Sequence, residues 1–427
     1  MNKIHPIKNI HLNLLSMINV FLSFLLIIIL GRKFGIGIET DTYFFALVFA
    51  DYLRKFISLT WTSIKHYYIE FKVKDTNVLN TVYVVMLNNI VLASLIIILL
   101  YYFITGYLSI LTEEVKAFMD VFIFFILVHS LLTFNKKILN LEKYYASVYL
   151  VEIFVAFINL MAVAFIMTED IITIAYSTIT ASIIVIFWQF REVFKLNGFK
   201  YKFIFYNKNL SKELFKNSIK LEFSSILYGS KDIVVASIFT SAGSGIYSLY
   251  SYASKFVGVI SQVVTAPAEN VYSAKIGYIV ANKEFNLANK RANEMWQRNS
   301  ILFLISVFAT YMLLPIVLKI MLNNQISENE IENVQFFFSL LAIYFLLKVL
   351  EIPYKKILYL FKYFNFDILA NITYFIIVIS GFYIISYTNI DYWLIIISII
   401  LAQFIKFVML LSKHKRHFKK ILNHSNN

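Results

Sequence analysis

Five charged residues lie inside apolar segments of the chain, where a charged side chain is energetically unfavourable. Asp51 and Arg54 lie in one segment, Lys231 and Asp232 in a second, and Lys255 in a third. A charged side chain at the bilayer centre costs about 3 kcal/mol on insertion scales, so it needs a purpose. Because arginine and lysine bind phosphate well, these positions predict a wet, positively charged cavity for an anionic head group, with diphosphate as the obvious candidate.

A structural alternative explains the same charges. Asp51 precedes Arg54 by three residues and shares its helix face, and Lys231 is adjacent to Asp232, so internal ion pairs could lock the helices. Counted from the expected outer ends, Arg54 is about 20 Å deep and Lys255 about 14 Å deep. Both interpretations remain open from sequence.

The other charges at depth favour structural explanations. Lys406 is near the inner end of its segment, where a lysine can snorkel to the interface. Lys348 and Glu351 are three residues apart on one helix face and are expected to pair. Three carboxylates lie within a turn or two of a segment end: Asp120, Glu152 and Asp367.

The composition indicates an all-α, polytopic membrane protein. Hydrophobic residues make up 59% of the 427 residues and charged residues 15%, with a mean hydropathy of +0.71, whereas soluble domains have about 25% charged residues. The chain has no cysteine and only scattered histidines, so we expect no metal site and no cofactor. The net charge of +14 sits between the apolar segments, which argues for membrane orientation and against nucleic acid.

Twelve membrane-spanning helices are expected. Their approximate ranges are 10–30, 42–64, 81–104, 118–134, 146–167, 171–190, 221–239, 246–274, 299–321, 333–354, 366–386 and 391–412. The two tails and the even-numbered connections hold 29 Lys and Arg residues, and the odd-numbered connections hold three. The positive-inside rule therefore places both termini in the cytoplasm.

The chain divides into an N-terminal six-helix lobe (1–195), a basic cytoplasmic linker (196–216) and a C-terminal six-helix lobe (217–427). An even number of spans in each lobe gives both lobes one orientation, so an internal repeat would be parallel. A trace of it is visible: Phe34–Gly37 and Ser241–Gly245 are both glycine-containing outer turns, each followed by a span with a cation ten to fifteen residues in.

The outer turn and the span after it resemble a known family. Residues 31–46 read GRKFGIGIETDTYFFA, and 53–55 read LRK. They follow, without a gap, the pattern A-R-x-F-G-A-G-x-x-T-D-A-F-F-V-A-F-x-x-P-N-x-L-R-R of the lipid II flippase (MurJ, MviN) family. Weaker matches are Asp232 with Ala236-Ser237 and the stretch Tyr252–Phe256. This family belongs to the multidrug/oligosaccharidyl-lipid/polysaccharide (MOP) exporter superfamily.

The resemblance implies a central cavity with charged functional residues at Arg32, Asp41, Arg54 and Lys255. The expected substrate-binding cations are then Arg32, Arg54, Lys231 and Lys255. The expected groups for charge pairing or coupling are Asp41, Asp51 and Asp232.

The chain also departs from the family pattern. Ala50-Asp51 replaces the P-N pair, Ser254 replaces an aspartate, and the early G-F-x-R-D segment is missing, since 23–27 reads SFLLI. Two C-terminal spans usual in the lipid II branch are absent. Twelve spans is the usual count of the Wzx-type O-antigen and capsule flippases, so either branch fits.

The leading hypothesis is a flippase, not an enzyme, that moves an undecaprenyl-diphosphate-linked sugar across the bacterial inner membrane by alternating access. A MATE-like cation or drug antiporter and a polymerase or ligase of the same glycan pathway are the alternatives. The expected partners are the lipid-linked saccharide, the bilayer and glycan-assembly proteins, with the chain as a monomer. Coupling to H⁺, Na⁺ or the membrane potential stays open, as do the sugar and the branch.

Overall fold

The fold comes from a computed structural model of the chain. The residues it describes are 9–62, 68, 76–107, 113–142, 144–166, 170–197, 208–265, 269, 272, 275–277, 279–280, 282–323, 326–361, 363–388 and 391–425. All regular secondary structure in these ranges is helical, which confirms the all-α class. Internal contacts divide the chain into two units, Met1–Ile226 and Leu227–Asn427. This boundary falls inside a helix, shortly after the 196–216 segment expected as the linker, of which 198–207 lies outside the described residues.

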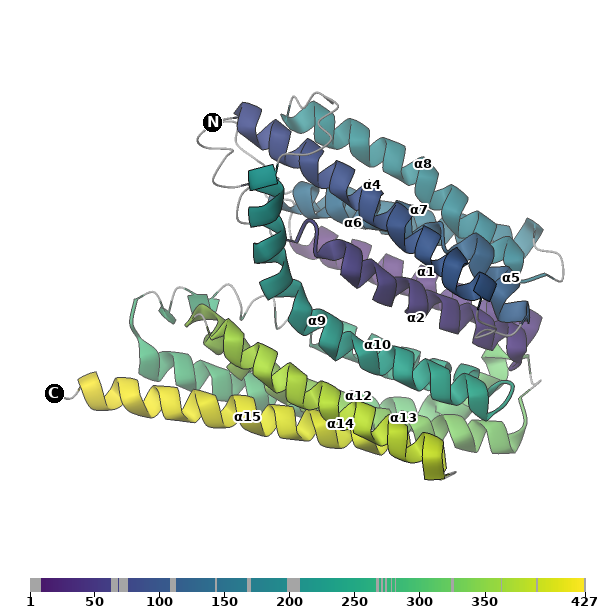
Figure 1. Cartoon of the computed structure of the whole chain (residues 1–427). Helices are drawn as coiled ribbons and strands as arrows, with labels where there is room; N and C mark the ends of the chain where they lie inside the picture. The colour runs from purple at the N-terminus through teal and green to yellow at the C-terminus, as the bar shows by residue number, and fades with distance from the viewer. Residues whose placement is uncertain are drawn as a thin grey trace. The chain divides into compact units, whose positions relative to one another are not determined.

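The first unit is a helical bundle (Figure 1). Its helices are α1 (Asn9–Phe34), α2 (Ile38–Ser58), α4 (Thr76–Tyr107), α5 (Glu113–Phe122), α6 (Phe125–Leu141), α7 (Tyr145–Met161) with a π-helical turn η1 (Ala162–Ile166), and α8 (Ile172–Asn197). Helix α1 packs on α7, α2 packs on α5 and α6, and α6 and α7 both pack on α8. Aliphatic side chains such as Val128, Val151 and Val185 fill the space between α6, α7 and α8.

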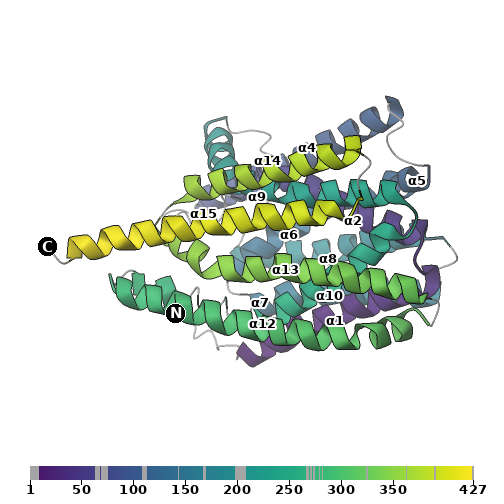
Figure 2. The same cartoon turned by 90° about the horizontal axis from the view of Figure 1, so that it is seen from below.

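The second unit is built around α13 (Figure 2). Helix α9 (Lys208–Ala242) enters it from the first unit, and α10 (Ile246–Val264), α12 (Phe285–Met321), α13 (Glu328–Leu360), α14 (Phe364–Thr388) and α15 (Leu394–Ser425) follow. Helix α13 packs on α10, α12 and α15, and α15 also packs on α14. A buried cluster that includes Ala292, Met295, Tyr354 and Phe418 joins α12, α13 and α15.

Among the described residues, eight helices are long and apolar enough to cross a bilayer, and nine if α5 and α6, which meet at a 43° bend, form one span, against the twelve spans expected. The other three expected spans fall on α2, α9 and α10, which do not reach that apolar character and which carry Arg54, Lys231 and Lys255. Their charges lower their hydropathy, so the polar spans are the ones expected to bind the substrate.

The outer surface of the bundles suits lipid. Exposed side chains on α12 include Ile305, Phe308 and Met312, and exposed side chains on α4 include Leu99 and Phe103. Contiguous apolar surface of this extent is rare in soluble monomers but is what hydrocarbon solvates. The chain is a multi-pass membrane protein.

Glycines with positive φ form the turn before the second helix in both halves. Gly35 has φ of 64° between α1 and α2, and Gly245 has φ of 83° at the start of α10. Such values are unfavourable for residues with a Cβ atom, so glycine suits both turns. The two turns precede the second and the eighth expected spans, the positions that a parallel repeat would make equivalent.

Candidate substrate-binding cavity

A cavity of about 780 Å³ lies inside the first unit. Its walls come from α1, α2, α6, α7, α8 and the part of α9 that belongs to this unit. Four cations line it, and they are Arg54, Lys55, Lys136 and Lys137. Two carboxylates also line it, Glu152 and Glu222. This excess of positive charge makes the cavity a site for an anion.

Arg54 lines the cavity and also pairs with Asp51 on its own helix. Its Nη2 and Nε atoms lie 2.6 and 3.1 Å from Asp51 Oδ1, and Lys55 Nζ lies 3.4 Å from Asp51 Oδ2. The Arg54 side chain is 20% exposed and that of Asp51 is 48% exposed. The pair expected from the spacing is therefore present, and one half-exposed carboxylate holds two cations at the cavity wall.

Helix α6 supplies the other half of the positive charge. His129, Thr133, Lys136 and Lys137 line the cavity at spacings that keep them on one helix face. Lys136 forms an ion pair with Glu152 of α7, whose other carboxylate oxygen accepts a hydrogen bond from Asn19 Nδ2 at 2.9 Å. Neither lysine is among the expected site residues, because both follow the expected span 118–134 and fall in a cytoplasmic connection, whereas α6 continues to Leu141.

A helical spacing in the sequence could have indicated these lysines. His129 is a polar residue in an otherwise apolar run, and Lys136 and Lys137 follow it by seven and eight residues. That spacing continues the face of His129 for two turns. The signal is weak without knowing where the helix ends.

Arg32 and Asp41 flank the α1–α2 turn. Arg32 is exposed in the last turn of α1, and Asp41 is buried in the first turn of α2. Each suits the helix dipole, since cations are favoured at C-termini and carboxylates at N-termini. Neither residue lines the 780 Å³ cavity, so their expected roles stay predictions.

Lys231, Asp232 and Lys255 belong to the second unit. Lys231 pairs with Asp232, and its Nζ atom lies 5.7 and 5.4 Å from the ring centres of Tyr228 and Tyr344. Lys255 is exposed on α10 and has no ion-pair partner among the described residues. That Arg54 and Lys255 act on one substrate stays a prediction.

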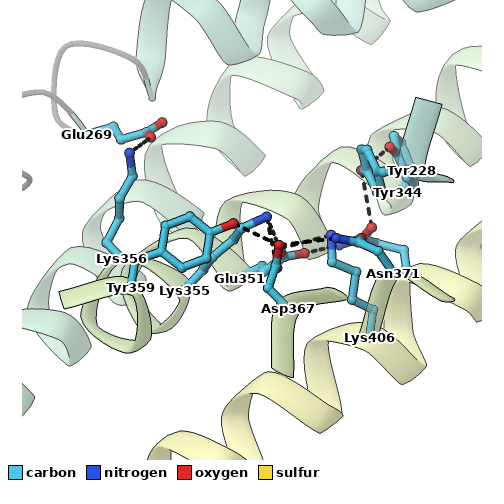
Figure 3. A network of polar contacts seen from close by, with 11 residues as sticks. Tyr228, Glu269, Tyr344, Glu351, Lys355, Lys356, Tyr359, Asp367, Asn371 and Lys406 are labelled. Carbon is cyan, nitrogen blue, oxygen red and sulfur yellow. Dashed lines mark hydrogen bonds and ion pairs between the residues drawn. The ribbon is translucent and has the colours of Figure 1, made fainter. Parts of the chain in front are cut away.

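A buried ion-pair network in the second unit corrects two expectations (Figure 3). Lys406 does not snorkel, because it is 2% exposed and its Nζ atom lies 3.1 Å from Glu351 Oε1. Glu351 also lies 3.6 Å from Lys355 Nζ and accepts a hydrogen bond of 2.6 Å from Gln403 Nε2. Lys348 is not its partner but lies 4.9 Å from the ring centre of Phe345.

Asp367 completes this network. Its Oδ1 atom lies 3.2 Å from Lys355 Nζ, and its Oδ2 atom accepts hydrogen bonds from Tyr359 at 2.8 Å and from Asn371 at 3.2 Å. The two carboxylates and the two lysines thus alternate, with Lys355 between Glu351 and Asp367. Buried charges arranged in this way compensate one another.

Comparison with known proteins identifies the fold. No family model and no curated protein matches the chain in sequence. A structure of the lipid II flippase MurJ in an inward closed conformation matches with a TM-score of 0.78 and 16% identity, over 96% of this chain and 90% of that one. An inward-facing multidrug resistance transporter of the MATE family matches with a TM-score of 0.74 and 10% identity, over 95% and 96%. The chain has the MOP superfamily fold.

A third matching structure is of another MOP superfamily transporter. This transporter, from Pyrococcus furiosus, is described by a reverse polarity of its binding pocket and matches with a TM-score of 0.67 and 11% identity, over 96% of this chain and 95% of that one. The first of these structures is of a flippase, and the other two are of transporters. The MOP fold expected from residues 31–55 and from the second-half matches is therefore confirmed.

Proposed function

We propose that this MOP-fold chain is a flippase that moves an undecaprenyl-diphosphate-linked saccharide from the inner to the outer leaflet of the bacterial inner membrane. The observation that carries the proposal is the cavity of the first unit, which four cations and two carboxylates line. A charged, sugar-bearing head group does not cross hydrocarbon unaided, since burying unpaired charge is costly. Such a cavity can replace its hydration while the lipid tail stays in the bilayer.

Arg54 is the central ligand in this proposal. Its guanidinium can bind two phosphate oxygens at once, which a lysine ammonium does not do with the same geometry. Asp51 pairs with the guanidinium, and a diphosphate would compete with that carboxylate. Arg32, Lys231 and Lys255 are proposed as further substrate contacts during the transport cycle.

Asp41, Asp51 and Asp232 are proposed to balance these cations or to couple transport to H⁺, Na⁺ or the membrane potential. The potential supplies about 2.3 kcal/mol per charge per 100 mV. Alternating access would expose the site to each side in turn, with both termini in the cytoplasm. The protein would work as a monomer beside the enzymes that assemble the glycan.

A MATE-like cation antiporter is the alternative, and the charges argue against it. Such a protein needs carboxylates that are free to attract a cation. In the described part of the second unit, Glu351 and Asp367 are each within ion-pair distance of a lysine. The cavity of the first unit carries more cations than carboxylates, which favours an anionic substrate.

Changes of charge at Arg54 test the proposal. Flipping of a fluorescent undecaprenyl-diphosphate-linked sugar in proteoliposomes should fall more than tenfold for Arg54→Gln and only in part for Arg54→Lys, which keeps the charge but loses the fork. Lys319→Gln is the matched control, because the Lys319–Glu328 pair is exposed.

The double variant Arg54→Gln with Asp51→Asn separates substrate binding from helix locking. It removes both charges of the Arg54–Asp51 pair and leaves Lys55, the second cation beside Asp51, at the cavity wall. We expect it to remain inactive, because the diphosphate ligand is gone. Restored flipping would mean that Arg54 only neutralises Asp51 and would refute its role as a ligand.

A further inference from the structure

Uncharged polar side chains also line the cavity of the first unit. Thr178, Ser182 and Gln189 of α8 line it, together with Asn159 of α7. Spacings of four and seven residues place the three α8 side chains on one helix face. A polar stripe on an otherwise apolar transmembrane helix needs partners, because lipid offers none.

Several polar atoms in this wall have no hydrogen-bond partner in the described part of the protein. They are Trp61 Nε1, Ser182 Oγ, and both the oxygen and the nitrogen of the Gln189 amide. The three residues are 3%, 1% and 0% exposed. Leaving a buried polar group unsatisfied costs about 1–3 kcal/mol. Four such atoms around one cavity indicate that a hydrogen-bonding occupant belongs there.

The neutral stripe is long enough to hold a group beside the one that the cations bind. Gln189, Ser182 and Thr178 lie about 25, 15 and 9 Å along α8 from its first residue, so the stripe covers about 16 Å of the helix. It lines the same cavity as Arg54 and Lys136.

We propose that the α8 stripe and Trp61 bind the sugar that is joined to the diphosphate. This inference rests on the proposed function and assigns a second subsite to the same cavity. A primary amide offers two donors and an acceptor, a hydroxyl offers one donor and accepts, and an indole N–H donates. Together they match the hydroxyl and amide groups of a saccharide and carry no charge that would compete with the diphosphate for the lysines.

A competition between two lipids tests this assignment. Purified chain in nanodiscs is given undecaprenyl diphosphate and undecaprenyl-diphosphate-linked N-acetylglucosamine, and the bound ratio is read by native mass spectrometry. Gln189→Leu and the milder Ser182→Ala should reduce the preference for the glycosylated lipid, by about tenfold for Gln189→Leu, and leave the affinity for the bare lipid within about twofold. Gln335→Leu, on α13 in the second unit, is the matched control.

Each outcome separates the subsite from the proposed function. Arg54→Gln should weaken both lipids equally, and unchanged binding of both would refute the diphosphate site itself. Gln189→Leu with wild-type preference would mean that the stripe holds only water, and equal weakening of both lipids would mean that it is structural. Either result overturns the sugar subsite and leaves the diphosphate site standing.

Discussion

The burial of Lys406 determines how strongly a substitution there destabilises the protein. A snorkelling lysine could be removed with little effect, but Lys406 is buried against Glu351 and its Nζ atom lies 4.1 Å from the ring centre of Tyr228. Lys406→Met should lower the free energy of unfolding by about 3 kcal/mol or more, because removing one partner leaves the other charge buried. The measurement is the loss of thermal stability in detergent.

An exposed ion pair supplies the control for this experiment. Lys319 Nζ lies 2.6 Å from Glu328 Oε1, with side chains 43% and 74% exposed. Lys319→Met should change the free energy of unfolding by less than about 1 kcal/mol. The double variant Lys406→Met with Glu351→Gln should recover part of the loss, whereas equal stability of the Lys406 and Lys319 variants would contradict the buried network.

Some of these residues can be recognised from the sequence and others cannot, for a physical reason. Arg54 is recognisable because a charge inside an apolar run has few explanations. Lys136 lies at the end of such a run, where cytoplasmic lysines are common, so the sequence does not distinguish it from them. Of the two lysines beside Glu351, Lys355 lies four positions along α13 and fits helical spacing, whereas Lys406, which lies closer, comes from α15 and is 55 residues away in the chain.

At the scale of the helices, hydrophobicity predicted the spans better than their ends. The expected span 299–321 is the last part of α12, which starts at Phe285, and the expected span 391–412 covers the first part of α15, which runs from Leu394 to Ser425. These extensions are rich in polar and charged residues. A hydrophobic run marks the part of a helix in lipid, while backbone hydrogen bonds continue the helix beyond it.

The turn glycine of the first half allows a test of the backbone argument. Gly35 has φ of +64° and no atom within 4 Å of a Cβ added there, so Gly35→Ala meets strain and no clash. It should destabilise the protein by about 1–2 kcal/mol. Gly35→Asn should cost less, because asparagine enters this conformation more readily. Thermal stability in detergent is the measurement.

Gly258 is the matched control for Gly35. It lies inside α10 without positive φ, and a Cβ there also meets nothing within 4 Å. Gly258→Ala should be neutral or stabilising by up to about 1 kcal/mol, because alanine favours the helix. If both alanine variants changed the stability in the same direction, the positive φ would not be the reason that position 35 requires glycine.

At the scale of the whole molecule, the fold narrows the function without naming the substrate. One fold is shared here by a lipid II flippase and by multidrug transporters, at 16% and 10% identity to this chain. Function therefore has to be argued from the site. The cavity charges favour an anion, and the α8 stripe favours a hydroxylated group next to it. Neither could be obtained from the fold or from residues 31–55 alone.

The orientation of the molecule is the last prediction, and the composition makes it easy to test. The chain has no cysteine, so one introduced thiol reports one position. Asn329 and Asn282 are both exposed and flank the span formed by α12, near its C-terminal and N-terminal ends. The distribution of Lys and Arg predicts that Asn329→Cys faces the outside and Asn282→Cys the cytoplasm. A membrane-impermeant maleimide added to intact cells should label Asn329→Cys, and should label Asn282→Cys only after permeabilisation. The reverse pattern would invert the topology, and labelling of both from one side would contradict α12 as a span.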